Sequence, residues 1–257
     1  MQPQIVAIGG GGLSDESGNL LLERYILNLA KKTNPKVCFV PTASGDSERY
    51  LLKFYTAFKE LQATTSHLPL FQLAVTDLRS HILSQDIIYV GGGNTRNMLL
   101  IWRAFGVDTT LREAWEQGTI LCGVSAGSIC WFEQGVTDSL VPNELRPMDG
   151  LGFLPGSNCP HYDGEPLRRP SFQRFVADGS ITGGFAADDW VGLHFVGRNM
   201  YQVVSAKSGA NAYQVTRNQM SFREEVITPV LLRNDAVAWH QVPGTASLER
   251  TVPKGTV

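Results

Sequence analysis

The sequence predicts an α/β protein built as a three-layer sandwich, with a mostly parallel central sheet between two layers of helices. Short β-branched runs alternate with helical patterns through the first half of the chain, and one of these runs ends at a glycine-flanked serine that precedes a helix. Later segments alternate with the period of strands, which predicts an antiparallel extension in the C-terminal part. In parallel α/β sheets, ligands bind beside the carboxyl ends of the strands, so we expect the functional residues at that edge.

The expected strands and helices of the first half follow from local patterns. Apolar runs ended by glycine or polar residues predict strands at 4–9, 36–42, 65–69, 85–90 and 119–124. Apolar residues at helical spacing predict helices at 19–33, from Ser44 or Asp46 to about 61, and at 94–105, 107–117 and 126–133. Ser44 and Asp46 are candidate helix caps, and Lys31 and Lys32 suit the C-terminus of the first helix.

The second half of the chain has a different character. Segment 141–157 is rich in Pro, Gly and Asn, which predicts a long loop near the site. Segments 190–195, 200–206, 212–216 and 226–232 alternate in polarity and predict the antiparallel extension. We expect a single domain over residues 1–235 and a C-terminal tail, 236–257, whose weak periodicity predicts partial disorder.

Composition and charge exclude several classes of protein. The 257 residues are 43% hydrophobic and 18% charged, and 22 Lys plus Arg against 24 Asp plus Glu give a formal net charge of −2. This balance excludes a broadly basic nucleic-acid binder. No run approaches the roughly 18 apolar residues of a spanning helix, and the N-terminus lacks signal-peptide features, so no membrane contact is expected. Four dispersed cysteines without a C-x-x-C pair indicate a reducing compartment, which we expect to be the cytoplasm.

Ser125 lies in the sequence Gly-Val-Ser-Ala-Gly, between an apolar run and a helical pattern. In this context, called a nucleophile elbow, the chain turns sharply from strand to helix. The neighbouring residues must then be small, and the serine oxygen projects at the carboxyl edge of the sheet. We therefore expect Ser125 to be a nucleophile. The alternative is a glycine-rich turn whose serine only caps the helix.

A serine nucleophile needs a base, because its hydroxyl is barely nucleophilic at neutral pH. Of the five histidines, His161 lies in a polar loop punctuated by Pro and Gly, and such loops often carry functional residues. His194 lies in an apolar strand and is expected in the core or the sheet, whereas His67 and His81 are expected at the surface or at strand ends. His161 is thus the expected base.

Three glycines, Gly91 to Gly93, end a predicted strand and precede a predicted helix. Their N–H groups and that of Ala126 are candidates to receive a developing oxyanion, and Asn94 and Thr95 are expected to contact the substrate. A tight turn that only lets the helix pack, or a phosphate cradle, is the alternative. The P-loop and the dinucleotide fingerprint are absent, and no His or Cys cluster has metal-ligand spacing, so we expect no cofactor and no metal.

The acid of a possible Ser-His-acid triad has several candidates. Asp188 and Asp189 precede a predicted strand, and Asp138 lies beyond the elbow; Glu133 and Asp163 are two further carboxylates. Any one of them is more often a cap or a solvated carboxylate than a group that orients a histidine. The Asp188/Asp189 pair is our first choice and Asp138 our second.

Three motifs, VGGGNT (90–95), GVSAGS (123–128) and the Pro160-His161 loop, together resemble the peptidase E family of serine peptidases, which includes the cyanophycinases. They occur in this order, with 32 residues from Gly93 to Ser125 and 36 from Ser125 to His161. The resemblance implies a fold similar to class I glutamine amidotransferase domains. It also implies Ser125 as nucleophile, His161 as base, and the amides of Gly93 and Ala126 as oxyanion hole.

The resemblance leaves the acid open. In cyanophycinase-like members a glutamate follows the histidine, in a segment similar to 184–190. This sequence has no glutamate there, and Asp188 or Asp189 is expected to substitute for it. An aspartate between nucleophile and histidine, as proposed for other members, would look like Asp138.

For function, the resemblance implies a serine exopeptidase that acts on short peptides, chiefly dipeptides with N-terminal aspartate. A substrate carboxylate needs a cationic clamp, which Arg168 or Arg169 could supply; the alternative is a solvated basic pair. The other functions considered are a cyanophycinase-like hydrolase of aspartyl-arginine linkages, a general esterase, and a non-catalytic small-molecule binding protein on the same scaffold. The expected partner is a small peptide, and we expect a monomer or a homodimer.

Overall fold

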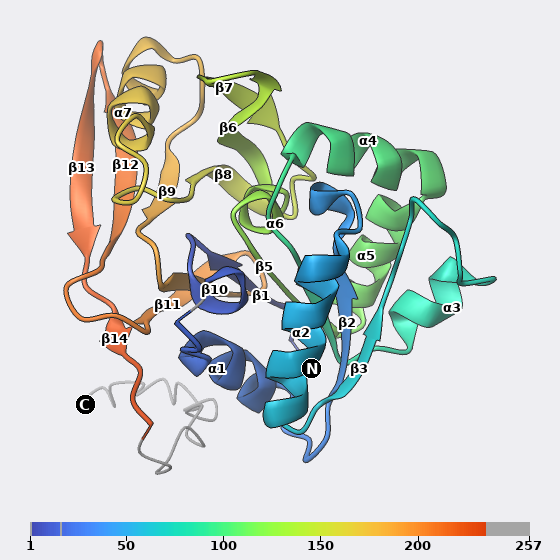
Figure 1. The fold of residues 1–257 in the computed structure, drawn as a ribbon. Coiled ribbons are helices and arrows are strands. Elements are labelled where there is room, and N and C mark those ends of the chain that lie inside the picture. Colours follow the sequence, from blue (N-terminus) through green and yellow to red (C-terminus); the bar gives the residue numbers. More distant parts are fainter. Residues whose placement is uncertain (1, 16, 235–257) are drawn as a thin grey trace, which may run out of the picture.

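Two β-sheets organise residues 2–15 and 17–234, the part of the chain that the computed structural model describes (Figure 1). The first sheet contains eight strands: β1 (Gln4–Ile8), β2 (Lys36–Val40), β3 (Thr64–His67), β4 (Ile87–Val90), β5 (Ile120–Val124), β10 (Val191–Val196), β11 (Asn199–Ser205) and β14 (Val230–Leu231). Their spatial order is β14-β11-β10-β1-β5-β4-β2-β3. The strands from β1 to β5 pair in parallel, whereas β10 pairs with β1, and β11 with β10, in antiparallel fashion. The mostly parallel sheet is as predicted.

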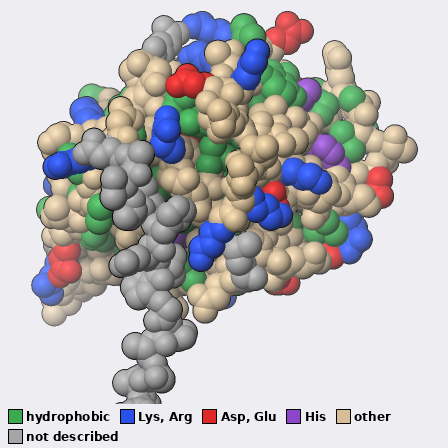
Figure 2. Space-filling view, turned by 90° about the horizontal axis from the view of Figure 1, so that it is seen from below, with side chains coloured by type: hydrophobic (Ala, Val, Ile, Leu, Met, Phe, Trp, Pro, Cys, Tyr) green, Lys and Arg blue, Asp and Glu red, His purple; other side chains and the backbone are tan. Residues whose placement is uncertain are grey.

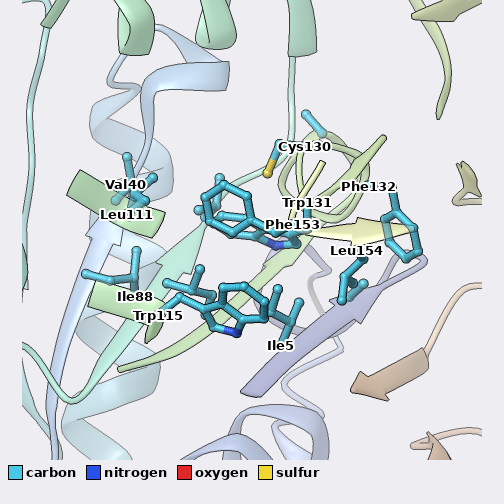
Figure 3. Close-up of a cluster of buried hydrophobic side chains, with 14 of the residues drawn as sticks. Ile5, Val40, Ile88, Leu111, Trp115, Cys130, Trp131, Phe132, Phe153 and Leu154 are labelled. Atoms are coloured by element: carbon cyan, nitrogen blue, oxygen red, sulfur yellow. The ribbon is translucent and has the colours of Figure 1, made fainter. Parts of the chain in front are cut away.

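Helices cover both faces of this sheet because successive strand residues point in opposite directions. Ile5 and Ala7 of β1 share a buried cluster with residues of α4 (Thr95–Phe105) and α5 (Val107–Glu116). Val6 and Ile8 share the other cluster with residues of α1 (Leu21–Leu29) and α2 (Glu48–Glu60). Strands buried on both faces are continuously apolar. The predicted three-layer α/β architecture is confirmed, and Figure 3 shows part of the first cluster around Trp115, Trp131 and Phe153.

The second sheet was not predicted. It has the order β13-β12-β9-β8-β6-β7. Its strands are β6 (Phe132–Val141), β7 (Glu144–Asp149), β8 (Leu154–Cys159), β9 (Gly184–Ala187), β12 (Ala212–Asn218) and β13 (Ser221–Ile227). On it packs α7 (Arg168–Asp178), which the sequence analysis also missed. The loop predicted at 141–157 is therefore wrong, because this segment forms β7 and β8. Pro147 is tolerated since β7 is an edge strand, where a missing N–H breaks no internal ladder.

Other differences concern boundaries. The helix after Ser125, α6 (Ala126–Ile129), is shorter than predicted, because the chain enters β6 at Phe132. The strand predicted at 226–232 is divided by Pro229 between β13 and β14. The antiparallel extension is shared between the sheets: β10 and β11 join the first, and β12 and β13 the second. Three short elements were not predicted: α3 (Leu78–Leu83) and the 3-10 helices η1 (Gly12–Ser14) and η2 (Thr42–Ser44).

On the face seen in Figure 2, basic, acidic and apolar side chains are interspersed, as the near-neutral net charge leads one to expect. Across the described ranges, no helix has the length and apolar character needed to cross a membrane. The tail predicted at 236–257 lies outside the described residues.

Candidate active site

The carboxyl end of β1 holds the three segments that carry most of the predicted site residues. The backbone carbonyls of residues 8, 9 and 10 accept hydrogen bonds from the N–H groups of Ser125, His161 and Trp190, at 3.1, 3.2 and 2.8 Å respectively. All three of these donors have positive φ angles, of 57°, 53° and 71°. Residues other than glycine adopt this conformation at a cost and often do so at functional sites. One strand end therefore sets the relative positions of these three backbone segments.

Ser125 stands at the turn between β5 and α6, as the elbow predicts. Its φ and ψ of 57° and −111° make the sharp bend, and its side chain makes no capping hydrogen bond to the helix. The alternative of a serine that only caps the helix therefore finds no support. The residues around the turn must be small because the backbones are close: a β-carbon on Gly127 would lie 2.4 Å from the Val90 carbonyl oxygen.

His161 pairs with Asp189. The distance from Nδ1 of His161 to Oδ1 of Asp189 is 2.7 Å, and the two side chains are 21% and 30% exposed. Gly10 and Gly164 flank the carboxylate so closely that a β-carbon would lie 1.9 Å from its Oδ1 or 2.4 Å from its Oδ2, respectively. The Asp189 N–H donates to Oδ1 of Asp163 at 2.8 Å. The pair is thus held from both sides, and Nε2 is the ring nitrogen left for a proton transfer.

Asp188 and Asp138, the other two preferred acid candidates, lie in different surroundings. Asp188 is buried, and its Oδ2 accepts hydrogen bonds from the Asn211 N–H at 2.8 Å and the Tyr213 hydroxyl at 3.4 Å. Its Oδ1 is buried without a partner among the described residues, and burial raises the pKa of this carboxyl. Asp138 is an exposed residue of β6. Of the three candidates, only Asp189 contacts His161.

The glycine loop after β4 supplies the second part of the predicted oxyanion hole. Gly93 has a φ of 139°, and a β-carbon there would lie 2.2 Å from the Ala43 carbonyl oxygen, so only glycine fits. The same carbonyl accepts from the Asn94 N–H at 2.8 Å, which fixes the loop. Within the described part of the chain, no acceptor occupies the N–H of Gly93 or of Ala126. Both amides therefore remain available for an anionic oxygen.

The predicted substrate contacts are engaged within the protein. Oδ1 of Asn94 caps α4 by accepting from the Asn97 N–H at 2.8 Å, and the Thr95 N–H donates to Oγ of Ser139 at 2.9 Å. Arg168 is buried, with Nε 2.7 Å from a Glu165 carboxylate oxygen and Nη1 2.7 Å from the Val136 carbonyl oxygen. Arg169 donates to Glu224 and lies over the rings of Tyr162 and Tyr213. The alternative of a solvated basic pair is thus wrong for Arg168, which is buried. Both guanidinium groups already have carboxylate partners.

His194 is a buried residue of β10, as predicted. Its Nδ1 lies 2.6 Å from the Tyr25 hydroxyl and its Nε2 3.0 Å from Oε1 of Gln4. Burial lowers the pKa of His194 to about 4, so the ring is neutral at pH 7. Outside the core, His67 and His81 contact Tyr55 and Cys38. None of these three histidines belongs to the site around Ser125.

Sequence reasoning missed the roles of Gly10, Asp163 and Trp190. The run of glycines after the first strand was compared only with the dinucleotide fingerprint. The signal that could have drawn attention to it is its place at the end of a buried strand, where parallel sheets bind ligands. Asp163 was considered only as a possible acid. No local signal predicts its contact with the Asp189 N–H, or that of Trp190 with Gly10, because these partners are distant in the chain.

Among the described residues, no hydrogen bond joins Oγ of Ser125 to His161. Catalytic hydrogen bonds are often long in unliganded enzymes and tighten when substrate binds. The arrangement thus holds a strained serine, a histidine–aspartate pair and two free amides at one edge of the sheet. Such a set of groups is suited to acyl transfer.

Comparisons with known proteins agree with this chemistry. Residues 5–203 match the model of peptidase family S51. An uncharacterized peptidase, YgaJ of Bacillus subtilis (strain 168), is 52% identical over 212 residues, which cover 82% of this chain and 91% of that protein. A crystal structure of a peptidase from an acI-B1 Actinobacterium covers 89% of this chain and 95% of its own, with a TM-score of 0.63 and 18% identity. A putative peptidase E protein from Listeria monocytogenes EGD-e covers 80% and 100%, with a TM-score of 0.58 and 17% identity. At these identities the two structures support the fold alone.

Proposed function

The chain belongs to peptidase family S51, and from this premise we propose that it is a serine exopeptidase that hydrolyses short peptides, chiefly dipeptides with N-terminal aspartate. The observation that carries the proposal is the hydrogen bonding of Ser125 and His161 to two consecutive carbonyls at the carboxyl end of β1, with Asp189 paired to the histidine. This arrangement provides a nucleophile, a base and an orienting acid from three distant parts of the chain. A serine-type mechanism follows from these groups.

In the proposed reaction, Nε2 of His161 takes the proton of Ser125 Oγ while that oxygen attacks the peptide carbonyl. Asp189 holds Nδ1–H and stabilises the imidazolium that forms. The amides of Gly93 and Ala126 donate to the oxyanion of the tetrahedral intermediate. His161 then gives its proton to the leaving amine, and the C–N bond breaks to leave an acyl group on Ser125. Water, deprotonated by His161, attacks this ester. The bond between the acyl carbon and Ser125 Oγ then breaks as His161 returns the proton to Oγ, which releases the acid and restores the serine.

The preference for N-terminal aspartate is the finer part of the proposal. It is supported by the resemblance of the three motifs to peptidase E, and it requires a cation that receives the substrate carboxylate. Arg168 and Arg169 are the proposed clamp, although each has a carboxylate partner in the absence of substrate. We place the enzyme in the cytoplasm, acting on a small peptide without a cofactor, as a monomer or homodimer.

A cyanophycinase-like activity on aspartyl-arginine linkages is the second candidate. One observation favours it: Asp189 follows His161 in the segment where cyanophycinase-like members carry their acid, and it is Asp189 that contacts the histidine. Both candidates share the same nucleophile, base and oxyanion hole. They differ in the substrate, which the geometry of these groups does not determine.

Two measurements test the proposal. Incubation with a fluorophosphonate should label Ser125 stoichiometrically, and the Ser125→Ala variant should not be labelled. A hydrolysis panel of Asp-X, Glu-X, Ala-X and isoaspartyl dipeptides, together with an aspartyl-arginine side-chain conjugate, should show the highest kcat/KM for Asp-X. Hydrolysis of the conjugate alone would favour the second candidate. Labelling without hydrolysis of any of these compounds would refute both substrates, and no labelling would refute the serine mechanism.

A further inference from the structure

Tyr162, the residue that follows His161, is buried and lies at the centre of a group of polar and aromatic side chains that extends to the surface at Arg169. The group, which we call the Tyr162 cluster, joins the catalytic loop to α7, β12 and β13; its members are Tyr162, Arg169, Gln173, Tyr213 and Glu224. The ring centroids of Tyr162 and Tyr213 are 5.0 Å apart, and the Arg169 guanidinium lies over both rings.

Glu224 of β13 is the acceptor at which the cluster converges. Its Oε2 accepts from the Tyr162 hydroxyl at 2.6 Å and from Nε2 of Gln173 at 2.8 Å, and its Oε1 accepts from Arg169. The Glu224 side chain is only 11% exposed. Burial alone would raise the pKa of Glu224, but the three donors outweigh it and hold the pKa below its usual value. Glu224 is thus an ionised carboxylate whose oxygens are occupied by protein donors.

The cluster reaches the residues next to both His161 and Asp189. Tyr162 directly follows the histidine, and its N–H donates to the Ala187 carbonyl at 3.1 Å. On the other side, the Tyr213 hydroxyl donates to Asp188, the residue that precedes Asp189. A displacement of the Tyr162 or Tyr213 ring would therefore be transmitted to the backbone on which the histidine–aspartate pair stands.

His161 needs such support. Its φ of 53° is unfavourable for a residue with a side chain, and a conformation of this kind persists only where the surroundings hold it. The N–H of His161 donates to the Gly9 carbonyl, and the His161 carbonyl accepts from the Glu165 N–H. The anchored ring of Tyr162 adds a third attachment at the adjacent residue.

We propose that Glu224 and Tyr162 are positioning residues, which hold His161 in the orientation needed to activate Ser125. This inference rests on the proposed serine mechanism. The match to the family model ends at residue 203, so Glu224 and Tyr213 belong to a part of the chain outside that match. The β12–β13 hairpin, which could pass for a peripheral addition to the fold, thus contributes to the active site through Tyr162.

The test compares Tyr162→Phe, Glu224→Ala and Glu224→Gln with a matched control, Tyr55→Phe. The control removes a hydroxyl that lies, like that of Tyr162, 2.6 Å from its partner, here Nδ1 of His67, away from the site. The first readout is the rate constant for fluorophosphonate labelling of Ser125, which depends on the base and not on the natural substrate. The second is amide hydrogen exchange of residues 161–163. Thermal unfolding midpoints identify variants that fail to fold.

We expect Tyr162→Phe and Glu224→Ala to slow labelling by up to about 100-fold, the effect of a misplacement near 1 Å. Exchange at 161–163 should accelerate in both variants, and where a peptide is hydrolysed kcat should fall while KM stays nearly constant. Glu224→Gln, which keeps an acceptor for the Tyr162 hydroxyl, should label faster than Glu224→Ala. Tyr55→Phe should label at the wild-type rate.

Two results would overturn the inference. One is a wild-type labelling rate and unchanged exchange in both Tyr162→Phe and Glu224→Ala. The other is an equal slowing in Tyr162→Phe and Tyr55→Phe, which would reflect a general loss of stability. If the wild-type protein is not labelled at all, the serine mechanism fails, and hydrogen exchange at 161–163 still decides whether the cluster holds His161.

Discussion

Oδ1 of Asp189 lies 2.7 Å from Nδ1 of His161, whereas the carboxyl group of Asp188, its neighbour in sequence, bonds the backbone of Asn211. Two identical side chains side by side in the chain thus have different surroundings. Successive residues of extended chain point to opposite sides, and a shift of one residue would exchange the two carboxylates. This geometry leads to distinct predictions for the two aspartates.

Asp189→Asn is expected to lower kcat by up to about 10⁴-fold with little change in KM, because the amide no longer holds the imidazole in the correct tautomer. Steady-state hydrolysis of a dipeptide substrate measures both constants. Asp188→Asn and Asp138→Asn are the matched controls, and each should retain activity within about tenfold of wild type, a difference of roughly 1.4 kcal/mol. A large loss in Asp138→Asn with a small one in Asp189→Asn would transfer the acid role to Asp138.

Ser125→Ala is expected to abolish turnover, leaving at most the contribution of binding and the oxyanion hole, about 10³ to 10⁴ over the uncatalysed rate. The unfolding free energy should change little, since one hydroxyl without a capping hydrogen bond is removed. Initial-rate assays and denaturant unfolding measure the two quantities. Ser128→Ala is the control, because Ser128 lies within α6 and its hydroxyl donates to Asn158. Activity of Ser125→Ala near the wild-type level would remove Ser125 from the mechanism.

Gly10→Ala is expected to reduce kcat/KM by about 100-fold or more, because the new methyl group displaces the histidine–aspartate pair. Its β-carbon would lie 1.9 Å from Oδ1 of Asp189 and 2.6 Å from Nδ1 of His161. The control is Gly192→Ala in β10, where the nearest atoms are side-chain carbons at 3.3 to 3.4 Å. Equal kcat/KM values for the two variants would contradict a role for the close approach at Gly10.

Local patterns were sufficient for the parallel part of the fold. The strands that carry Val90 and Val124 are buried on both faces and therefore appear as apolar runs, and the elbow at Ser125 is a short motif with its own steric requirement. The second sheet was missed because its pairings join distant segments, such as β9 with β12, and because its strands contain Pro and Gly. The alternation at 212–216 does predict β12, but no period in the sequence marks β7, β8 or β9.

In the candidate site, too, some residues are identified by local sequence and others only by contacts between distant parts of the chain. Ser125 and His161 could be chosen from their immediate neighbours in the chain, whereas the choice between Asp188 and Asp189 depends on the direction of one side chain. That direction is set by tertiary contacts, with Asn211 on one side and the glycine-lined space beside Gly10 on the other. The sequence therefore limited the acid to a few aspartates, and the fold distinguishes among them.

Arg169→Met separates a substrate clamp from a positioning role. If Arg169 binds the substrate carboxylate, the loss in kcat/KM, converted to a transition-state free energy, should be roughly 2 to 5 kcal/mol larger for Asp-X than for Ala-X. This is the range for truncation of one partner of a buried charge pair. An equal fall for both substrates would instead indicate a positioning role, because Arg169 donates to Glu224 and covers two tyrosine rings. Arg168→Met, assayed on the same pair of substrates, tests the other half of the proposed clamp.

Titration of His194 should weaken the fold in mild acid. Burial lowers the pKa of His194 to about 4, against 6.5 for an exposed histidine, so the unfolded chain binds its proton at a higher pH than the folded one. The stability that the neutral ring contributes is therefore complete above pH 6.5 and is lost as the pH falls from 6.5 towards 4. A shift of this size corresponds to about 3 kcal/mol in the free energy of unfolding. In the folded protein, the Tyr25 hydroxyl and Gln4 occupy the two ring nitrogens.

Denaturant unfolding of wild type and His194→Gln at several pH values between 7 and 4 measures the effect. Other groups titrate in both proteins, so their contribution cancels in the difference between the two free energies. We expect the wild type to be the more stable of the two at pH 7 and to lose about 3 kcal/mol of that advantage by pH 4. A difference that stays constant across this range would show that His194 does not remain neutral in the folded state, and the 2.6 Å contact with Tyr25 would then have to accommodate an imidazolium.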